Sequence, residues 1–139
     1  LSQPLNNVKP SNFWGSHHSW RGFTFENVCF DHIRQIKFAL GISGVHTETY
    51  SWKGNESQID LLIDRDDRLI NICECKFSSR EYAIDKSYDE KIRDRQGAFI
   101  DETNTKKSTI MTFVTTYGLK QNEYSGRIQS VITSDDLFR

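Results

Sequence analysis

Residues 58–77 decide the fold, and their sequence is QIDLLIDRDDRLINICECKF. Two apolar runs, 58–64 and 69–77, flank a short charged turn and predict two neighbouring strands of a hairpin. Alternate side chains of a strand share a face, so Glu74 and Lys76 lie in line with two isoleucines. The opposite face of that strand is apolar as well. A strand that is buried on both faces has no simple structural reason to carry a carboxylate and an ammonium group.

The segments around this hairpin predict its partners in the fold. Apolar residues at helical spacing indicate a helix that ends before Gly41, and alternating or polar patterns follow further along the chain. The expected elements are a helix over 24–40, strands over 45–52, 58–64 and 69–77, a polar helix over 88–100, and strands over 109–116 and 127–133. This order predicts an α/β fold in which helices sandwich a mixed β-sheet.

Composition excludes several classes of protein. The chain has 139 residues, 18 Lys and Arg against 19 Asp and Glu, and a formal net charge of −1, so it cannot hold nucleic acid by bulk charge. No apolar run approaches the ~20 residues that cross a bilayer, and no signal peptide is visible. Three cysteines without a disulfide-scaffold spacing favour a reducing, cytoplasmic setting. We expect them to be small buried hydrophobic residues and not zinc ligands.

The length corresponds to one domain. Residues 1–21 contain two prolines and many polar residues, which predicts an irregular arm that leads into a single domain over 22–139. Because the chain begins with Leu1 and not with Met, we expect it to be the C-terminal part of a longer protein.

Three acidic residues and one lysine form the candidate site. Opposed residues of an antiparallel pair share a face, so Asp60 joins Glu74 if the connecting loop has three or five residues, or if a β-bulge shifts the register by one position. Two adjacent carboxylates beside Lys76 favour a divalent cation, and their hard oxygen atoms favour Mg²⁺ or Mn²⁺. Glu26 falls within the apolar arc of the first helix. It either reaches solvent at the helix end or belongs to the site, and the sequence favours neither alternative.

At these residues the sequence resembles a known family. Asp60, followed by Glu74-Cys75-Lys76, is similar to the D…ExK core of the PD-(D/E)XK, restriction-endonuclease-like nuclease superfamily, and Glu26 matches an acidic residue on the first helix of many members. Ile59 replaces the proline of the motif. Residues 22–138 more narrowly resemble the C-terminal nuclease-like domain of prokaryotic AAA-type ATPases, with further landmarks at 25–27, 58–65, 73–77, 115–118 and 136–138.

The resemblance implies a role for each residue of the site. Asp60, Glu74 and the backbone carbonyl of Cys75 would hold the metal, and Glu26 would complete the site. Lys76 would orient and help to deprotonate the attacking water molecule. Gln58 would support the cluster. The implied activity is metal-dependent hydrolysis of phosphodiester bonds, in DNA before other substrates.

The implied partners are DNA and the ATPase module of the parent chain, with no membrane. Lys91, Arg95 and Gln96 on the polar helix are weak candidates for phosphate contacts, because acidic residues interleave with them. A homodimer stays open, since many nucleases of this fold cut duplexes as dimers. The alternative function is a nuclease-fold module with weak or lost catalysis that binds or regulates its ATPase.

Overall fold

The computed structural model of the chain describes residues 20–139, with side chains from Phe25 onward. The arm expected over residues 1–21 therefore lies outside the described residues up to residue 19. Its last two residues are not irregular, because the first helix already begins at Trp20.

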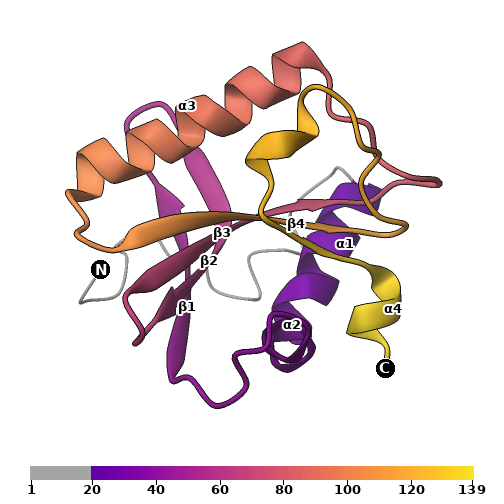
Figure 1. Cartoon of the computed structure of the whole chain (residues 1–139), viewed down its shortest axis with the longest axis horizontal. Coiled ribbons are helices and arrows are strands. Elements are labelled where there is room, and N and C mark those ends of the chain that lie inside the picture. The colour runs from indigo at the N-terminus through magenta and orange to yellow at the C-terminus, as the bar shows by residue number, and fades with distance from the viewer. Residues whose placement is uncertain (1–19) are drawn as a thin grey trace.

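A five-stranded mixed sheet forms the centre of the domain (Figure 1), with the strand order β1-β2-β3-β4-β5. Strand β2 runs antiparallel to both β1 and β3, whereas β4 runs parallel to β3 and β5 runs parallel to β4. Their bounds are β1 Thr47–Lys53, β2 Gln58–Arg65, β3 Leu69–Lys76, β4 Ser108–Thr115 and β5 Ser130–Ile132. The expected α/β fold with a mixed sheet is confirmed.

Helices cover both faces of this sheet (Figure 1). The long helix α3 (Lys86–Thr103) lies on one face, and α1 (Trp20–Asp31), α2 (Ile33–Ala39) and the short α4 (Ser134–Leu137) lie on the other. A 3₁₀ turn at Ser125–Arg127 precedes β5. Within residues 20–139, no helix combines the length and the apolar character needed to cross a membrane.

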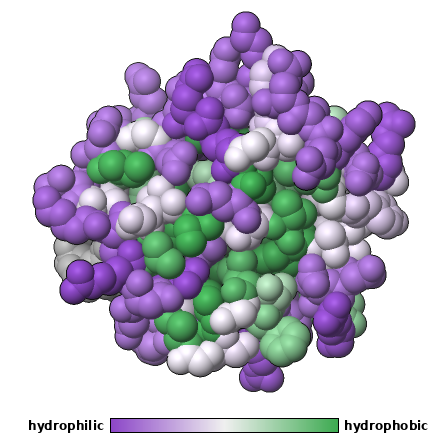
Figure 2. Space-filling model, viewed as in Figure 1, coloured by the Kyte–Doolittle hydropathy of each residue, from purple (hydrophilic) through white to green (hydrophobic). Residues whose placement is uncertain are grey.

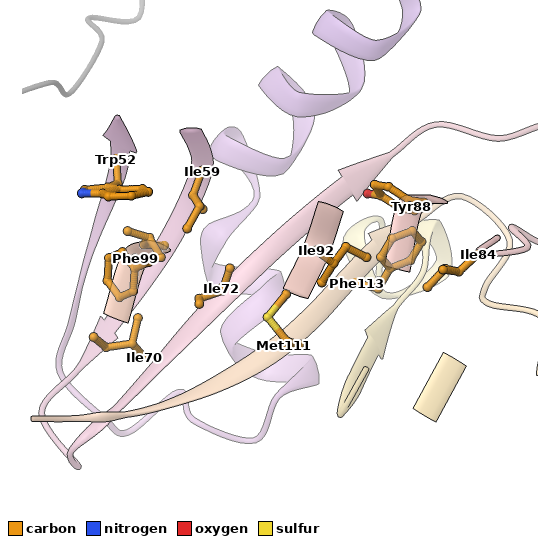
Figure 3. Close-up of a cluster of buried hydrophobic side chains, with 11 residues drawn as sticks. Trp52, Ile59, Ile70, Ile72, Ile84, Tyr88, Ile92, Phe99, Met111 and Phe113 are labelled. Atoms are coloured by element: carbon orange, nitrogen blue, oxygen red, sulfur yellow. The ribbon is translucent and has the colours of Figure 1, made fainter. Parts of the chain in front are cut away.

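Two apolar clusters fill the spaces between sheet and helices. The cluster under α3 runs from Trp52 and Phe99 at one end to Tyr88 and Ile84 at the other (Figure 3). The second cluster joins α1, α2 and α4 to the opposite face through residues such as Cys29, Ile36 and Leu61. At the surface, apolar side chains gather in the centre of the face in Figure 2, with hydrophilic ones around them.

One expected helix is in fact two. The helix expected over 24–40 breaks at His32, whose backbone angles (φ −120°, ψ 33°) leave the helical region, and whose Nδ1 lies 2.7 Å from the carbonyl oxygen of Val28. The break turns α2 against the sheet and keeps Ile36 fully buried. The sequence correctly predicted the apolar arc of the helix expected over 24–40, but it did not predict the break at His32.

The other differences lie at element ends. Helix α3 is longer than expected at both ends, because Asp85 caps its first turn and Asn104 ends it in the left-handed conformation. Strand β5 is shorter than expected, and α4 was not expected at all. A four-residue helix with a capping box is too short to show a helical period in the sequence.

Candidate functional site

The β2–β3 hairpin places the two strand carboxylates next to each other. Leu61 pairs with Cys73, and continuing this register by one position sets Asp60 beside Glu74. The connecting turn has three residues, Asp66 to Arg68, and Arg68 adopts a φ of 72°. A three-residue turn with one left-handed residue is a common hairpin connection, and its odd length gives the register that the sequence requires for a shared site.

These residues line a pocket of about 230 Å³ at one end of the two strands. Its lining brings together side chains from α1, β2, β3 and α3, namely Glu26, Gln58, Asp60, Cys73, Glu74, Cys75, Lys76 and Arg95. Six of these were singled out in the sequence as catalytic, metal-binding or supporting residues. The structure therefore places the expected residues at one point of the molecule.

Glu74 is the most buried acid of the pocket, with 6% of its surface exposed. Its Oε1 accepts hydrogen bonds from the Tyr88 hydroxyl group (2.7 Å) and from Nη1 of Arg95 (2.5 Å). Among the residues that the structure describes, no hydrogen bond reaches Oε2 of Glu74. One carboxylate oxygen is thus held by α3, and the other is available to a further cation.

The charge of Glu74 also changes the pKa values of Tyr88 and Arg95, the two groups that donate hydrogen bonds to it. Burial, followed by the negative charge of Glu74, raises the pKa of Tyr88 far above its ordinary value, so its hydroxyl group keeps its proton. Burial alone would lower the pKa of Arg95, but the charge and hydrogen bond of Glu74 outweigh that effect and raise it. Both donors to Glu74 therefore stay protonated.

Lys76 lies on the aromatic face of Tyr88. Its Nζ is 5.0 Å from the centroid of the Tyr88 ring, which is within the range of a cation–π interaction. The lysine is partly exposed and lines the same pocket as Asp60 and Glu74. The pocket therefore holds an ammonium group beside its carboxylates.

Gln58 and Glu26 also line the pocket, and they differ in their surroundings. Gln58 donates a hydrogen bond from Nε2 to Oδ1 of Asp60 at 2.8 Å, as expected for a supporting residue. Glu26 comes from α1 and is partly buried. Its charge is close enough to contribute to the raised pKa of the Cys75 thiol, so it belongs to the pocket and does not simply reach into solvent.

The donor set suits a hard divalent cation at Asp60 and Glu74, because carboxylate oxygens from adjacent strands are the ligands that Mg²⁺ and Mn²⁺ prefer. A metal ion shared by all three acids does not fit equally well. Within the described residues, no three His, Cys, Asp or Glu side chains are grouped so that they could hold one metal ion. Glu26 lines the pocket together with Asp60 and Glu74, but the three side chains are not grouped at one point in this structure.

The three cysteines gather on the α1 side of the sheet. Cys29 and Cys73 are buried, and Cys75 is partly exposed. Burial raises the pKa of Cys73, and a hydrogen bond with Cys29 followed by burial raises that of Cys75. The burial expected of the cysteines is therefore seen for Cys29 and Cys73, whereas Cys75 is partly exposed.

The three candidate phosphate contacts on α3 have different positions. Lys91 is exposed and does not line the pocket. Gln96 donates a hydrogen bond to Oγ1 of Thr109 (2.8 Å), which directs it toward β4. Only Arg95 reaches the site, where it pairs with Glu74.

Tyr88 and the pairing of Arg95 with Glu74 were missed in the sequence. Their signal is the helical spacing of residues 88, 92, 95 and 99, which places Arg95 in the buried stripe of α3 beside Ile92 and Phe99. A cation inside an apolar stripe requires a buried acid as its partner. The sequence had already indicated Glu74 as an acid on a buried strand.

No protein-family model and no curated protein matches the sequence. The chain is similar to the solved structure of a protein of unknown function, AF1548, with 19% sequence identity and a TM-score of 0.47. The match covers 76% of this chain and 57% of AF1548, so this chain spans less than two thirds of that protein.

Proposed function

We propose that this domain is a metal-dependent nuclease that hydrolyses phosphodiester bonds in DNA, and that it works with an ATPase module of a longer chain. The observation that carries the proposal is the single pocket that Asp60, Glu74, Lys76 and Glu26 line together. A lysine beside paired carboxylates on adjacent strands combines a site for a hard cation with a fixed positive charge for phosphate.

The proposal gives each residue of the pocket a role in this reaction. Asp60 and Glu74, with the Cys75 carbonyl group, would hold Mg²⁺ or Mn²⁺. The bound ion would polarise the phosphate and lower the pKa of a water molecule. Lys76 would orient the attacking water and offset the negative charge that grows on the phosphate. Gln58 holds one oxygen of Asp60 and so fixes the direction of its carboxylate.

A second candidate function is supported by the ion pair between Arg95 and Glu74. A cation of the protein itself already neutralises the most buried acid. In a domain that has lost catalysis, this pair would simply stabilise the fold, and the domain would bind or regulate its ATPase. The two functions differ in whether a divalent cation binds at the pocket.

The test compares the parent protein with Asp60→Ala and Lys76→Ala. We expect Mg²⁺ and Mn²⁺ to raise the melting temperature of the parent and not that of Asp60→Ala, because binding to the folded state stabilises it. Plasmid cleavage should need the metal and fall by about 10²–10³-fold in Lys76→Ala, as for the loss of one group that stabilises the transition state. Lys106→Ala, an exposed lysine outside this pocket, is the charge-matched control.

Metal stabilisation equal in the parent and in Asp60→Ala would place the cation elsewhere. Cleavage that survives Lys76→Ala unchanged would remove the proposed mechanism. If the parent protein neither binds metal nor cleaves DNA, the regulatory module becomes the better description.

A further inference from the structure

Tyr88 touches both functional residues of β3 at once. Its hydroxyl group donates to Oε1 of Glu74 at 2.7 Å, and its ring lies under Nζ of Lys76 at 5.0 Å from the centroid. Glu74 and Lys76 project from the same face of β3, two positions apart, so one side chain from α3 can reach both.

Tyr88 itself is held rigidly from three directions. Its backbone N–H donates to Oδ1 of Asp85 at 2.8 Å, which fixes it in the first turn of α3. Its ring packs edge-on against Tyr82 and Phe113, with centroid distances of 5.8 and 6.3 Å. With 8% of its surface exposed, Tyr88 has little freedom to move. Its contacts with Glu74 and Lys76 therefore fix these two side chains relative to α3.

We propose that Tyr88 is a positioning residue that aligns the Glu74 carboxylate for the metal and seats the Lys76 ammonium for the phosphate. The inference rests on the proposed nuclease function and deepens it. The hydroxyl group engages one carboxylate oxygen and turns the other toward the pocket. The ring supports Lys76 through its π face and not through an acceptor oxygen, so the N–H groups that point away from the ring stay available to water and phosphate.

Two parts of the side chain have two separable tasks. Packing in the core under α3 needs only the ring, and a phenylalanine ring would fill the same space (Figure 3). The hydroxyl group is needed only for Glu74. Tyr88→Phe therefore removes the link to Glu74 and leaves the cation–π contact, whereas Tyr88→Leu removes both. Tyr82→Phe is the matched control, because Tyr82 packs on Tyr88 and, among the described residues, its hydroxyl group makes no hydrogen bond with Glu74.

Binding of Mn²⁺, measured by calorimetry without DNA, tests the link to Glu74. Groups that orient metal ligands typically change affinity by 10–100-fold, so we expect the dissociation constant of Tyr88→Phe to rise by about 10-fold or more. Tyr82→Phe should bind Mn²⁺ as the parent does. A merely structural role would lower the melting temperature in EDTA without this selective change in affinity.

Cleavage measured at increasing Mn²⁺ concentration tests whether the Tyr88 ring positions Lys76. The kcat of Tyr88→Phe should return to within about 3-fold of the parent at saturating metal, because its defect lies in metal affinity. The kcat of Tyr88→Leu should stay at least about 10-fold low at saturating metal, because Lys76 has lost its support. If Tyr88→Leu does not fold, the calorimetry of Tyr88→Phe decides alone.

The outcomes separate this inference from the proposed function. If the parent binds Mn²⁺ and cleaves DNA while Tyr88→Phe equals Tyr82→Phe in affinity, the role of Tyr88 is wrong and the nuclease function stands. If the parent neither binds Mn²⁺ nor cleaves DNA, the proposed function fails and this inference fails with it.

Discussion

Glu74 carries its charge at a position where only 6% of its surface meets solvent, so its partners decide what the pocket can hold. A buried carboxylate is costly unless cations and hydrogen bonds compensate it. Arg95 is that cation here, with 29% of its side chain exposed and an Nη1–Oε1 distance of 2.5 Å. A divalent ion that binds Glu74 would take over part of the same task. Arg95 and the metal are therefore partial substitutes at one carboxylate.

The variant Arg95→Met tests whether a metal ion can take the place of Arg95 beside Glu74. Without metal, Arg95→Met should lower the free energy of unfolding by about 2 kcal/mol, because a buried charge loses one hydrogen-bonded partner and keeps only Tyr88. Added Mn²⁺ should recover part of that loss, so its melting temperature should rise more with Mn²⁺ than that of the parent. Denaturant titrations with EDTA and with Mn²⁺ measure both effects.

The control for Arg95→Met is Arg93→Met on the same helix. Arg93 has 54% of its side chain exposed and lies 3.9 Å from Asp94, so its loss should change stability by less than about 1 kcal/mol. A stabilisation by Mn²⁺ that is smaller in Arg95→Met than in the parent would show that Arg95 supports metal binding and does not stand in for it.

The β2–β3 hairpin sets the register of the site. At its turn, a hydrogen-bond network of Arg65, Asp67, Asn71 and Thr112, called the clasp below, links the strands. Arg65 is buried and donates to both carboxylate oxygens of Asp67, at 2.9 and 2.7 Å. It also donates to Asn71, which in turn donates to Thr112 on β4. The clasp joins three strands near the turn, whereas the pocket lies at the opposite ends of β2 and β3.

Asp67→Asn tests the clasp through its pH dependence. The hydrogen bond from Arg65 holds the pKa of Asp67 below its ordinary value of 3.8. A lowered pKa stabilises the fold above the ordinary value, and this contribution disappears as the pH falls through the pKa of the folded state. The parent should therefore exceed Asp67→Asn by about 1 kcal/mol at pH 7, since 39% of the Asp67 side chain is exposed.

Chemical denaturation at pH 7, 5 and 3 measures this difference, which should stay constant at the two higher values and shrink at the lowest. Asp66→Asn is the control, because its exposed side chain lies outside the clasp. A difference that grows as the pH falls would contradict the assigned sign.

The elements with a clear period were predictable from the sequence, and those set by tertiary contacts were not. The faces of β2 and β3 follow from alternation alone, whereas the odd turn was only a condition for placing Asp60 beside Glu74, and the structure meets that condition with three residues. The break at His32 depends on a local contact with Val28 that no hydrophobic period records. The pairing of Arg95 with Glu74 joins residues 21 positions apart, and only the packing of α3 on the sheet brings them together.

Across the whole molecule, the balance of charge limits how this domain could hold a nucleic acid. The chain has a formal net charge of −1. The described residues that line the pocket repeat this balance, because three acids (Glu26, Asp60 and Glu74) and two cations (Lys76 and Arg95) give a formal charge of −1. A phosphate would be repelled from such a pocket until a divalent ion reverses its sign. DNA binding should therefore depend on the cation and should be weak in its absence.

Fluorescence anisotropy with labelled duplex DNA and the parent protein, recorded before the duplex is cleaved, measures this dependence. With Mn²⁺ we expect binding that weakens with salt at a slope of about −2 to −3 in a logarithmic plot, as two or three phosphate contacts would give. With EDTA the affinity should fall by at least about 10-fold, because the pocket returns to net negative charge. Tight binding in EDTA with a slope steeper than about −6 would mean that an extended basic surface holds the DNA. The acidic pocket would then be secondary to that surface in substrate binding.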